Sequence, residues 1–247
     1  MNAYNAQRYA RVAGILLVVS IFAGGFGESY VPGKLLAAND IAETARRMAA
    51  SVGLFRASFA AYLIEVTCDL SLTAIFYMLL RPVSRPLSLI AACFGVFGTA
   101  TFAVGEIFYF AAALPVIDPN VARALTPDAR ASFIYLCLTM YGYVFNIFAA
   151  IYGIPVMLRG YMIFRSGYLP RVLGGFVLFG GAGFIIKNFV TVLAPQYDSM
   201  AFVLPMFLAM AGMAFWFLGK GIDRARWEQM AVVTEDGQNR TPREEMR

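Results

Sequence analysis

Long apolar stretches separated by short polar segments are the feature that most constrains this chain. A helix needs about 20 mainly apolar residues to cross a bilayer. Of all residues 60% are hydrophobic and only 14% are charged, so a water-soluble fold could not cover the apolar surface. The sequence therefore predicts an all-α fold, a polytopic membrane helix bundle with six transmembrane helices at residues 12–30, 54–80, 87–114, 131–158, 172–194 and 200–218.

The composition changes near residue 219. We therefore expect residues 1–218 to form one six-helix transmembrane domain. Residues 219–247 mix acidic side chains with arginine, glycine and proline. Such a segment buries too little apolar surface to fold alone, and we expect a disordered cytoplasmic tail.

A short amphipathic helix is predicted between the first two spans. Asn39 and Asp40 are helix-capping residue types, and Glu43 follows Asp40 by three positions. Apolar residues then recur at helical spacing at positions 41, 45, 48 and 52, opposite Glu43 and two arginines. We expect this helix to lie on the extracytoplasmic face of the bundle or membrane.

The distribution of basic residues predicts the orientation. With the N-terminus inside, thirteen lysines and arginines fall in cytoplasmic segments and five in outer loops. Cytoplasmic loops carry the excess of such residues, so both termini are expected in the cytoplasm. This asymmetry also accounts for the net charge of +5, and nucleic acid is not an expected partner.

The chain contains no histidine and only three cysteines, Cys68, Cys93 and Cys137, all within apolar runs. No Ser-His or Cys-His pair is available for nucleophilic catalysis, and histidine-ligated metals are excluded. The sequence therefore predicts no catalytic residue, no metal site and no cofactor, and an enzyme is the interpretation that fits least.

Several motifs resemble a known family. They are Ala13-Gly14, Leu54-Phe55-Arg56, the segment 79–85 (LLRPVSR), Gly160-Tyr161 and the segment 165–174 (RSGYLPRVLG). The sequence resembles, over roughly residues 10–218, the bacterial membrane family called domain of unknown function 4386. The resemblance implies a multi-pass protein of the bacterial cytoplasmic (inner) membrane, and it implies no activity and no catalytic residues.

Polar side chains form a stripe along the second span. Ser58, Tyr62, Glu65, Asp69 and Thr73 follow one another at intervals of three or four residues, which places them on one helix face. Two carboxylates four residues apart resist ionising together. We therefore expect Glu65 and Asp69 to share at least one proton and to form, with Asn146 of the fourth span, a polar site inside the membrane.

A second set of polar residues is expected near the outer ends of the spans. Two acids and two bases at similar depth would neutralise each other as a buried network. The expected outer charged cluster consists of Glu28, Arg56, Glu106, Lys187 and Asn188.

Two functions remain open at this stage. The carboxylate stripe favours small-solute or ion/proton-coupled transport through a polar interior. A membrane sensor or interaction subunit without catalytic activity is the alternative. The expected partners are the lipid bilayer, a small polar solute or cation, and a cytoplasmic protein; the sequence predicts no oligomeric state.

Overall fold

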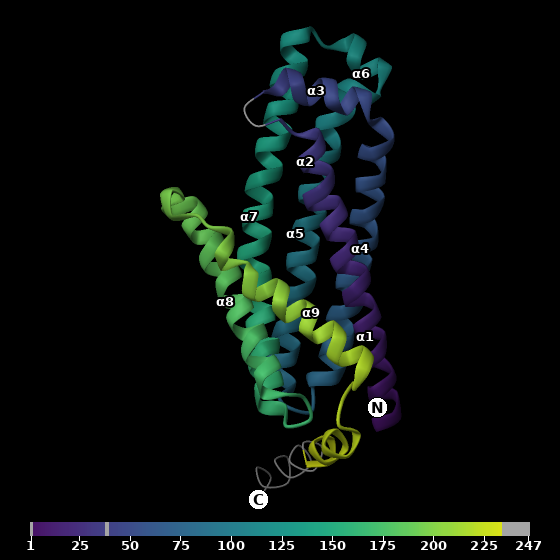
Figure 1. Cartoon of the computed structure of the whole chain (residues 1–247), viewed down its shortest axis with the longest axis vertical. Coiled ribbons are helices and arrows are strands. Elements are labelled where there is room, and N and C mark those ends of the chain that lie inside the picture. Colours follow the sequence, from purple (N-terminus) through teal and green to yellow (C-terminus); the bar gives the residue numbers. More distant parts are fainter. Residues whose placement is uncertain (1, 38–39, 234–247) are drawn as a thin grey trace, which may run out of the picture. The chain divides into compact units, whose positions relative to one another are not determined.

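The computed structural model describes residues 2–37 and 40–233, and every regular element within these ranges is helical (Figure 1). The predicted all-α fold is confirmed. The helices are α1 (Ala3–Gly24), a π-helical turn (Gly25–Tyr30), α2 (Val31–Leu35), α3 (Ile41–Ala50), α4 (Val52–Leu80), α5 (Arg85–Ile117), α6 (Pro119–Ala124), α7 (Pro127–Ser166), α8 (Arg171–Leu193), two 3-10 turns (Pro195–Tyr197 and Met200–Phe202) and α9 (Leu204–Gly219).

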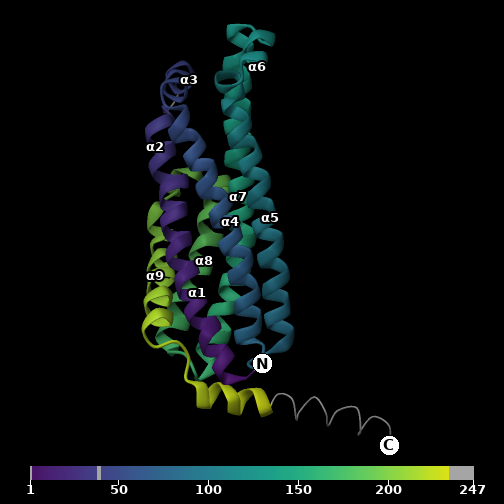
Figure 2. The ribbon, with the colours of Figure 1, turned by 90° about the vertical axis from the view of Figure 1, so that its right-hand side faces the viewer.

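Five of the described helical segments are long and apolar enough to cross a membrane, and they coincide with the first five predicted spans. The sixth is shorter than predicted. Helix α9 has 16 residues, about 24 Å at 1.5 Å per residue, against a hydrocarbon core of about 30 Å. A bend of 102° separates it from a helix at Arg224–Val233 (Figure 2). The described chain therefore has five spans, or six if this bent pair counts as one.

The chain is organised into two compact units built from discontinuous segments. The first unit comprises Met1–Val18, Leu70–Phe97 and Ala149–Arg247; the second comprises Val19–Asp69 and Gly98–Phe148. Helices α1, α4, α5 and α7 each contribute to both units. One helix can therefore belong to both units. The predicted division of the chain into residues 1–218 and residues 219–247 does not include this arrangement.

The turn that connects α7 to α8 in the first unit is fixed by its backbone conformation and by a side-chain hydrogen bond. Gly167 has φ +68°, a left-handed conformation that glycine adopts without a steric penalty, and Pro170 precedes the first residue of α8. The Tyr168 hydroxyl donates to the Leu79 carbonyl at 2.7 Å, and burial raises the pKa of this hydroxyl. The Leu79 carbonyl lies in the last turn of α4, where carbonyls lack partners within the helix.

The beginning of the predicted disordered tail is folded. The Trp227 indole, 3% exposed, donates to the same Leu79 carbonyl at 3.1 Å. Near the bend, the Gln7 side chain donates to the Lys220 carbonyl and accepts from the Ile222 amide. These bonds hold residues 220–233 against α1 and α4 of the first unit, so composition underestimated their order. Residues 234–247 lie outside the described part of the chain.

Glycines allow the helices of the first unit to approach closely. A Cβ added to Gly180 of α8 would lie 2.9 Å from the Met206 Cα of α9. A Cβ on Gly181 would lie 2.6 Å from the Met157 amide nitrogen of α7. The chain reverses direction between α8 and α9 (Figure 1). The two helices can pack closely because glycine has no side chain at the point of contact.

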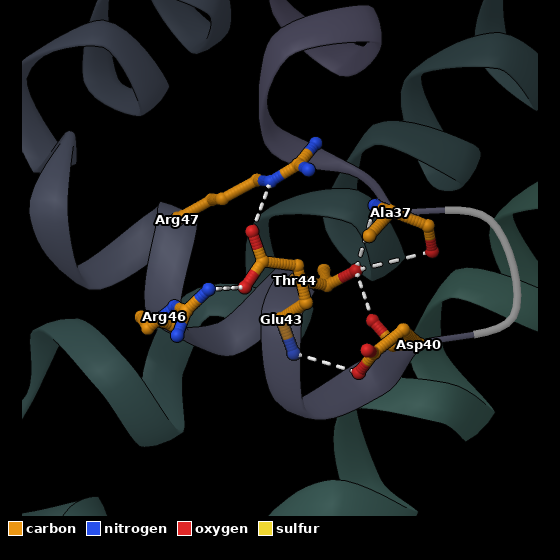
Figure 3. A network of polar contacts seen from close by, with 6 residues as sticks. All are labelled: Ala37, Asp40, Glu43, Thr44, Arg46 and Arg47. Carbon is orange, nitrogen blue, oxygen red and sulfur yellow. Dashed lines mark hydrogen bonds and ion pairs between the residues drawn. The ribbon is translucent and has the colours of Figure 1, made fainter.

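In the second unit, α3 is the predicted amphipathic helix, and it runs across the direction of α2 and α4 (Figure 1). The Asp40 side chain caps it by accepting a hydrogen bond from the Glu43 amide at 2.8 Å, which confirms the predicted capping. Figure 3 shows the network that follows: Glu43 pairs with Arg46 and Arg47, and the buried Thr44 hydroxyl bonds the backbone at Ala37. The hydrogen bond from Arg47 is the main cause of the lowered pKa of Glu43. Asn39 lies outside the described residues.

Two adjacent glycines of α8 test the close packing of the first unit. A Cβ on Gly174 would meet the Phe164 backbone, with its Cα at 2.7 Å, whereas a Cβ on Gly175 would meet nothing within 4 Å. We expect Gly174→Ala to lower the free energy of unfolding by about 1–3 kcal/mol through overpacking. Gly175→Ala should be neutral or stabilising by up to about 1 kcal/mol. Denaturant unfolding in detergent micelles measures both, and equal values for the two variants would contradict the packing described.

Candidate functional site

Four residues of the polar stripe lie in the second unit, on the part of α4 that ends at Asp69. Ser58, Tyr62 and Asp69 are buried, and Glu65 is half-buried. Glu65 is 13 residues from one end of α4 and 15 from the other, so about 20 Å of helix lies on either side. An acid this far from both ends of a membrane helix is costly to place and is often functional.

Four acids gather in the second unit, and we call them the acidic cluster: Glu28, Glu65, Asp69 and Glu106. Glu28 belongs to the π-helical turn after α1, and Glu106 to α5. Glu65 interacts electrostatically with each of the other three, and the carboxyl groups of Glu28 and Glu65 are within hydrogen-bonding reach. The cluster therefore joins two acids of the predicted stripe with two acids assigned to the outer charged cluster.

Three of these acids have no cationic partner within residues 2–37 and 40–233. In the described part of the chain, no lysine or arginine forms an ion pair with Glu28, Glu65 or Glu106. Both carboxyl oxygens of Glu106, which is 4% exposed, and Oε2 of Glu65 are enclosed without a hydrogen-bond partner among the described residues. Enclosed polar atoms of this kind are rare in folded proteins and call for an explanation.

Asp69 differs from these three because it has a hydroxyl partner. The Ser20 hydroxyl of α1 donates to Asp69 Oδ1 at 3.5 Å. Ser20 is itself buried. The acidic cluster is thereby linked to α1 as well as to α4 and α5.

Three tyrosines of the second unit, Tyr62, Tyr109 and Tyr141, lie close to one another. The Tyr62 and Tyr141 hydroxyls lie 3.1 Å apart. The Tyr109 ring centroid lies 5.8 Å from that of Tyr62 and 5.2 Å from that of Tyr141. Both Tyr62 and Tyr141 interact electrostatically with Glu106 and Glu28. Hydroxyls both donate and accept hydrogen bonds, so these side chains can hold a proton or a polar solute beside the acids.

The backbone of α1 approaches the acidic cluster at Gly24. A Cβ on Gly24 would lie 2.6 Å from Glu65 Oε1, whereas one on Gly25 would meet nothing within 4 Å. The π-helical turn that carries Glu28 begins directly after Gly24. Such turns insert one residue into the helical repeat and occur frequently at functional sites.

Among the remaining predicted site residues, Arg56 and Asn146 belong to the second unit, and Lys187 and Asn188 belong to the first. Arg56 is exposed, and in the described chain it forms no ion pair with Glu28 or Glu106. Asn146 is half-buried on α7. In the first unit, the Lys187 ammonium lies 3.8 Å from Asp198 Oδ2, and the Asn188 amide donates to the Phe184 carbonyl at 2.7 Å.

Thr73, the last residue of the predicted stripe, lies in the first unit. Its hydroxyl accepts a hydrogen bond of 2.9 Å from the guanidinium of Arg159 on α7. Sequence reasoning missed this arginine because it assigned Arg159 to a cytoplasmic loop, whereas α7 continues to Ser166.

Sequence reasoning also missed Tyr109, although its position three residues after Glu106 places both side chains on one face of α5. No group of three or more Asp, Glu or Cys residues in the described part of the chain has the geometry to hold a metal ion.

Comparison with known proteins identifies the family. The model of a family described as "domain of unknown function (DUF4386)" matches residues 12–221. The chain belongs to this DUF4386 family. It is also 26% identical over 158 residues to an uncharacterized protein of Archaeoglobus fulgidus, an alignment that covers 63% of this chain and 78% of that one. No solved structure matches the chain.

The match extends over both units of this DUF4386 protein, and it includes the π-helical turn, α4 and α5, which carry the acidic cluster. The predicted resemblance is therefore confirmed. The family description contains no activity, so it adds none to the site.

The contact between Gly24 and Glu65 can be tested with a matched pair of variants. We expect Gly24→Ala to displace the Glu65 carboxyl and to lower the free energy of unfolding by about 1–3 kcal/mol. Gly25→Ala should have little effect. Replacing Glu65 by Ala in the Gly24→Ala background should recover part of the loss, because residues in contact are not additive. Purely additive effects of Gly24→Ala and Glu65→Ala would show that the two positions do not touch.

Proposed function

We propose that this membrane protein couples the movement of protons to transport of a small solute or cation, with the acidic cluster as the proton-binding site. The observation that carries the proposal is the enclosure of Glu65 and Glu106 carboxyl oxygens that have no hydrogen-bond partner among the described residues. An ionised carboxylate in such surroundings is strongly disfavoured. Membrane proteins place ionisable side chains at this depth mainly where ions or protons pass.

The number and mutual proximity of the acids support proton exchange rather than static burial. Glu28, Glu65, Asp69 and Glu106 repel one another when ionised, so gaining or losing one proton changes the state of the others. The Tyr62 and Tyr141 side chains interact electrostatically with Glu106 and Glu28, and a hydroxyl can donate one hydrogen bond while it accepts another. A solute that binds here would compete with, or require, a proton.

Proteoliposomes with a trapped pH-sensitive dye test this proposal. Under an imposed pH gradient and in the presence of Na⁺ or K⁺, we expect the wild-type protein to dissipate the gradient faster than empty vesicles. Glu65→Gln and Glu106→Gln should reduce this flux to the level of empty vesicles, because an amide keeps the shape but cannot exchange a proton.

Glu43→Gln is the control for these variants. Glu43 is also an acid of the second unit, but it lies on α3 and is paired with Arg46 and Arg47, so this variant should retain wild-type flux. Wild-type flux in both amide variants would remove the acidic cluster from the function. Flux of the wild-type protein no faster than that of empty vesicles would favour a sensor or interaction subunit.

We also propose that the protein lies in the cytoplasmic membrane with both termini in the cytoplasm. The asymmetry of lysine and arginine described above supports this orientation. In a variant with Cys93 replaced by Ser, a cysteine introduced at Ser84 should react with a membrane-impermeant reagent only after cell lysis. A cysteine at Asn120 should react in intact cells, and the reverse pattern would invert the topology.

A further inference from the structure

Five enclosed oxygen atoms of the second unit have no hydrogen-bond partner among the described residues: both carboxyl oxygens of Glu106, Oε2 of Glu65, and the hydroxyls of Tyr109 and Thr99. Glu106 is 4% exposed, Tyr109 0% and Thr99 1%. These three residues follow one another at intervals of seven and three, which places them on one side of α5. All five atoms can accept a hydrogen bond, so a group rich in donors would satisfy them.

Glu106 is the residue that links these acceptors. Its carboxyl group interacts electrostatically with Tyr109 and with Glu65. The Tyr109 hydroxyl lies near the Ser58 side chain, but not in hydrogen-bonding geometry, and Ser58 donates to the Phe55 carbonyl at 2.7 Å. We call Glu65, Glu106 and Tyr109 the acceptor site.

Aromatic rings lie around the same acid. Tyr62, Tyr109 and Tyr141 each interact electrostatically with Glu106. The Phe55 ring stacks on that of Tyr109 with a centroid distance of 5.4 Å. The face of an aromatic ring attracts a cation within about 6 Å. Surroundings that disfavour a carboxylate on its own therefore suit a carboxylate paired with a cation.

We propose that the acceptor site binds a small primary ammonium cation, either ammonium itself or an alkylammonium ion. Its positive charge neutralises an ionised Glu106, and its N–H groups donate to the carboxyl oxygens and to the Tyr109 hydroxyl. This inference rests on the proposed function and names the solute class of its site. A protonated carboxyl group of the acidic cluster releases its proton to water when the cation binds, so that one cation exchanges for one proton.

Ligand-dependent stability of the whole protein in detergent tests binding without requiring transport. We would record the thermal unfolding midpoint at pH 7 during titration with methylammonium chloride, and separately with tetramethylammonium chloride and with sodium chloride at matched ionic strength. A ligand that binds only the folded state raises the midpoint in a saturable manner. We expect this from methylammonium alone, because tetramethylammonium carries the charge without an N–H group. No saturable shift with methylammonium, or an equal shift with either other salt, would overturn the proposal.

Tyr109→Phe removes one acceptor and keeps the ring. Because this hydroxyl has no partner, the midpoint without ligand should be unchanged or higher. The apparent affinity for methylammonium should fall about tenfold, through loss of one hydrogen bond to a charged group. Tyr143→Phe is the matched control, since Tyr143 is a 61% exposed tyrosine of the same unit, and it should keep the wild-type affinity. Unchanged affinity in Tyr109→Phe would overturn the site as described.

Glu106→Gln should abolish the saturable shift, whereas Glu43→Gln should retain it. A Glu106→Gln protein that folds and keeps the shift would overturn the proposal, and if this variant does not fold, Tyr109→Phe decides. The flux assay separates the two proposals. If methylammonium does not bind but proton flux depends on Glu106, only the solute class is wrong. If methylammonium binds and wild-type flux equals that of empty vesicles, the ammonium site stands and proton-coupled transport is wrong.

Discussion

The cost of an unpaired charge away from water is the constraint on which this structure depends. Membrane helices cannot use solvent to stabilise ionised side chains, so each such group needs a partner, a proton or a ligand. Lys187 has an acid partner in Asp198, the acidic cluster encloses carboxyl oxygens that lack a hydrogen-bond partner among the described residues, and the Arg159 guanidinium lies against the Phe76 ring and donates to the Thr73 hydroxyl.

Small residues make these arrangements possible. Gly24 lets the backbone of α1 approach the Glu65 carboxyl, and Gly95 leaves room for the Arg159 guanidinium. At either position, the methyl group of an alanine would clash with a polar side chain. Glycine therefore has a chemical role here in addition to the helix packing for which it is common in membrane proteins.

The sequence predicts those features that depend only on the spacing of residues within a single helix. Apolar runs predicted the long helices, and spacings of three and four predicted that Ser58, Tyr62, Glu65 and Asp69 share a face. The capping of α3 by Asp40 is equally local. Partners on other helices are not local: depth alone suggested pairing of Arg56 with acids, whereas its side chain is exposed. Likewise, the position of Glu28 depends on a π-helical turn, and Arg159 on where α7 ends, which periodicity does not encode.

The most direct test of the account is whether the acidic cluster carries protons at neutral pH. Infrared spectroscopy distinguishes protonated from ionised carboxyl groups, and the purified protein can be compared with Glu65→Gln, Glu106→Gln and Glu43→Gln. We expect a protonated-carboxyl band at pH 7 that weakens in the first two variants and is unchanged in Glu43→Gln, because Glu43 is a half-buried acid paired with two arginines. Absence of that band in the wild-type protein at pH 7 would show that the acids are ionised and would contradict the account.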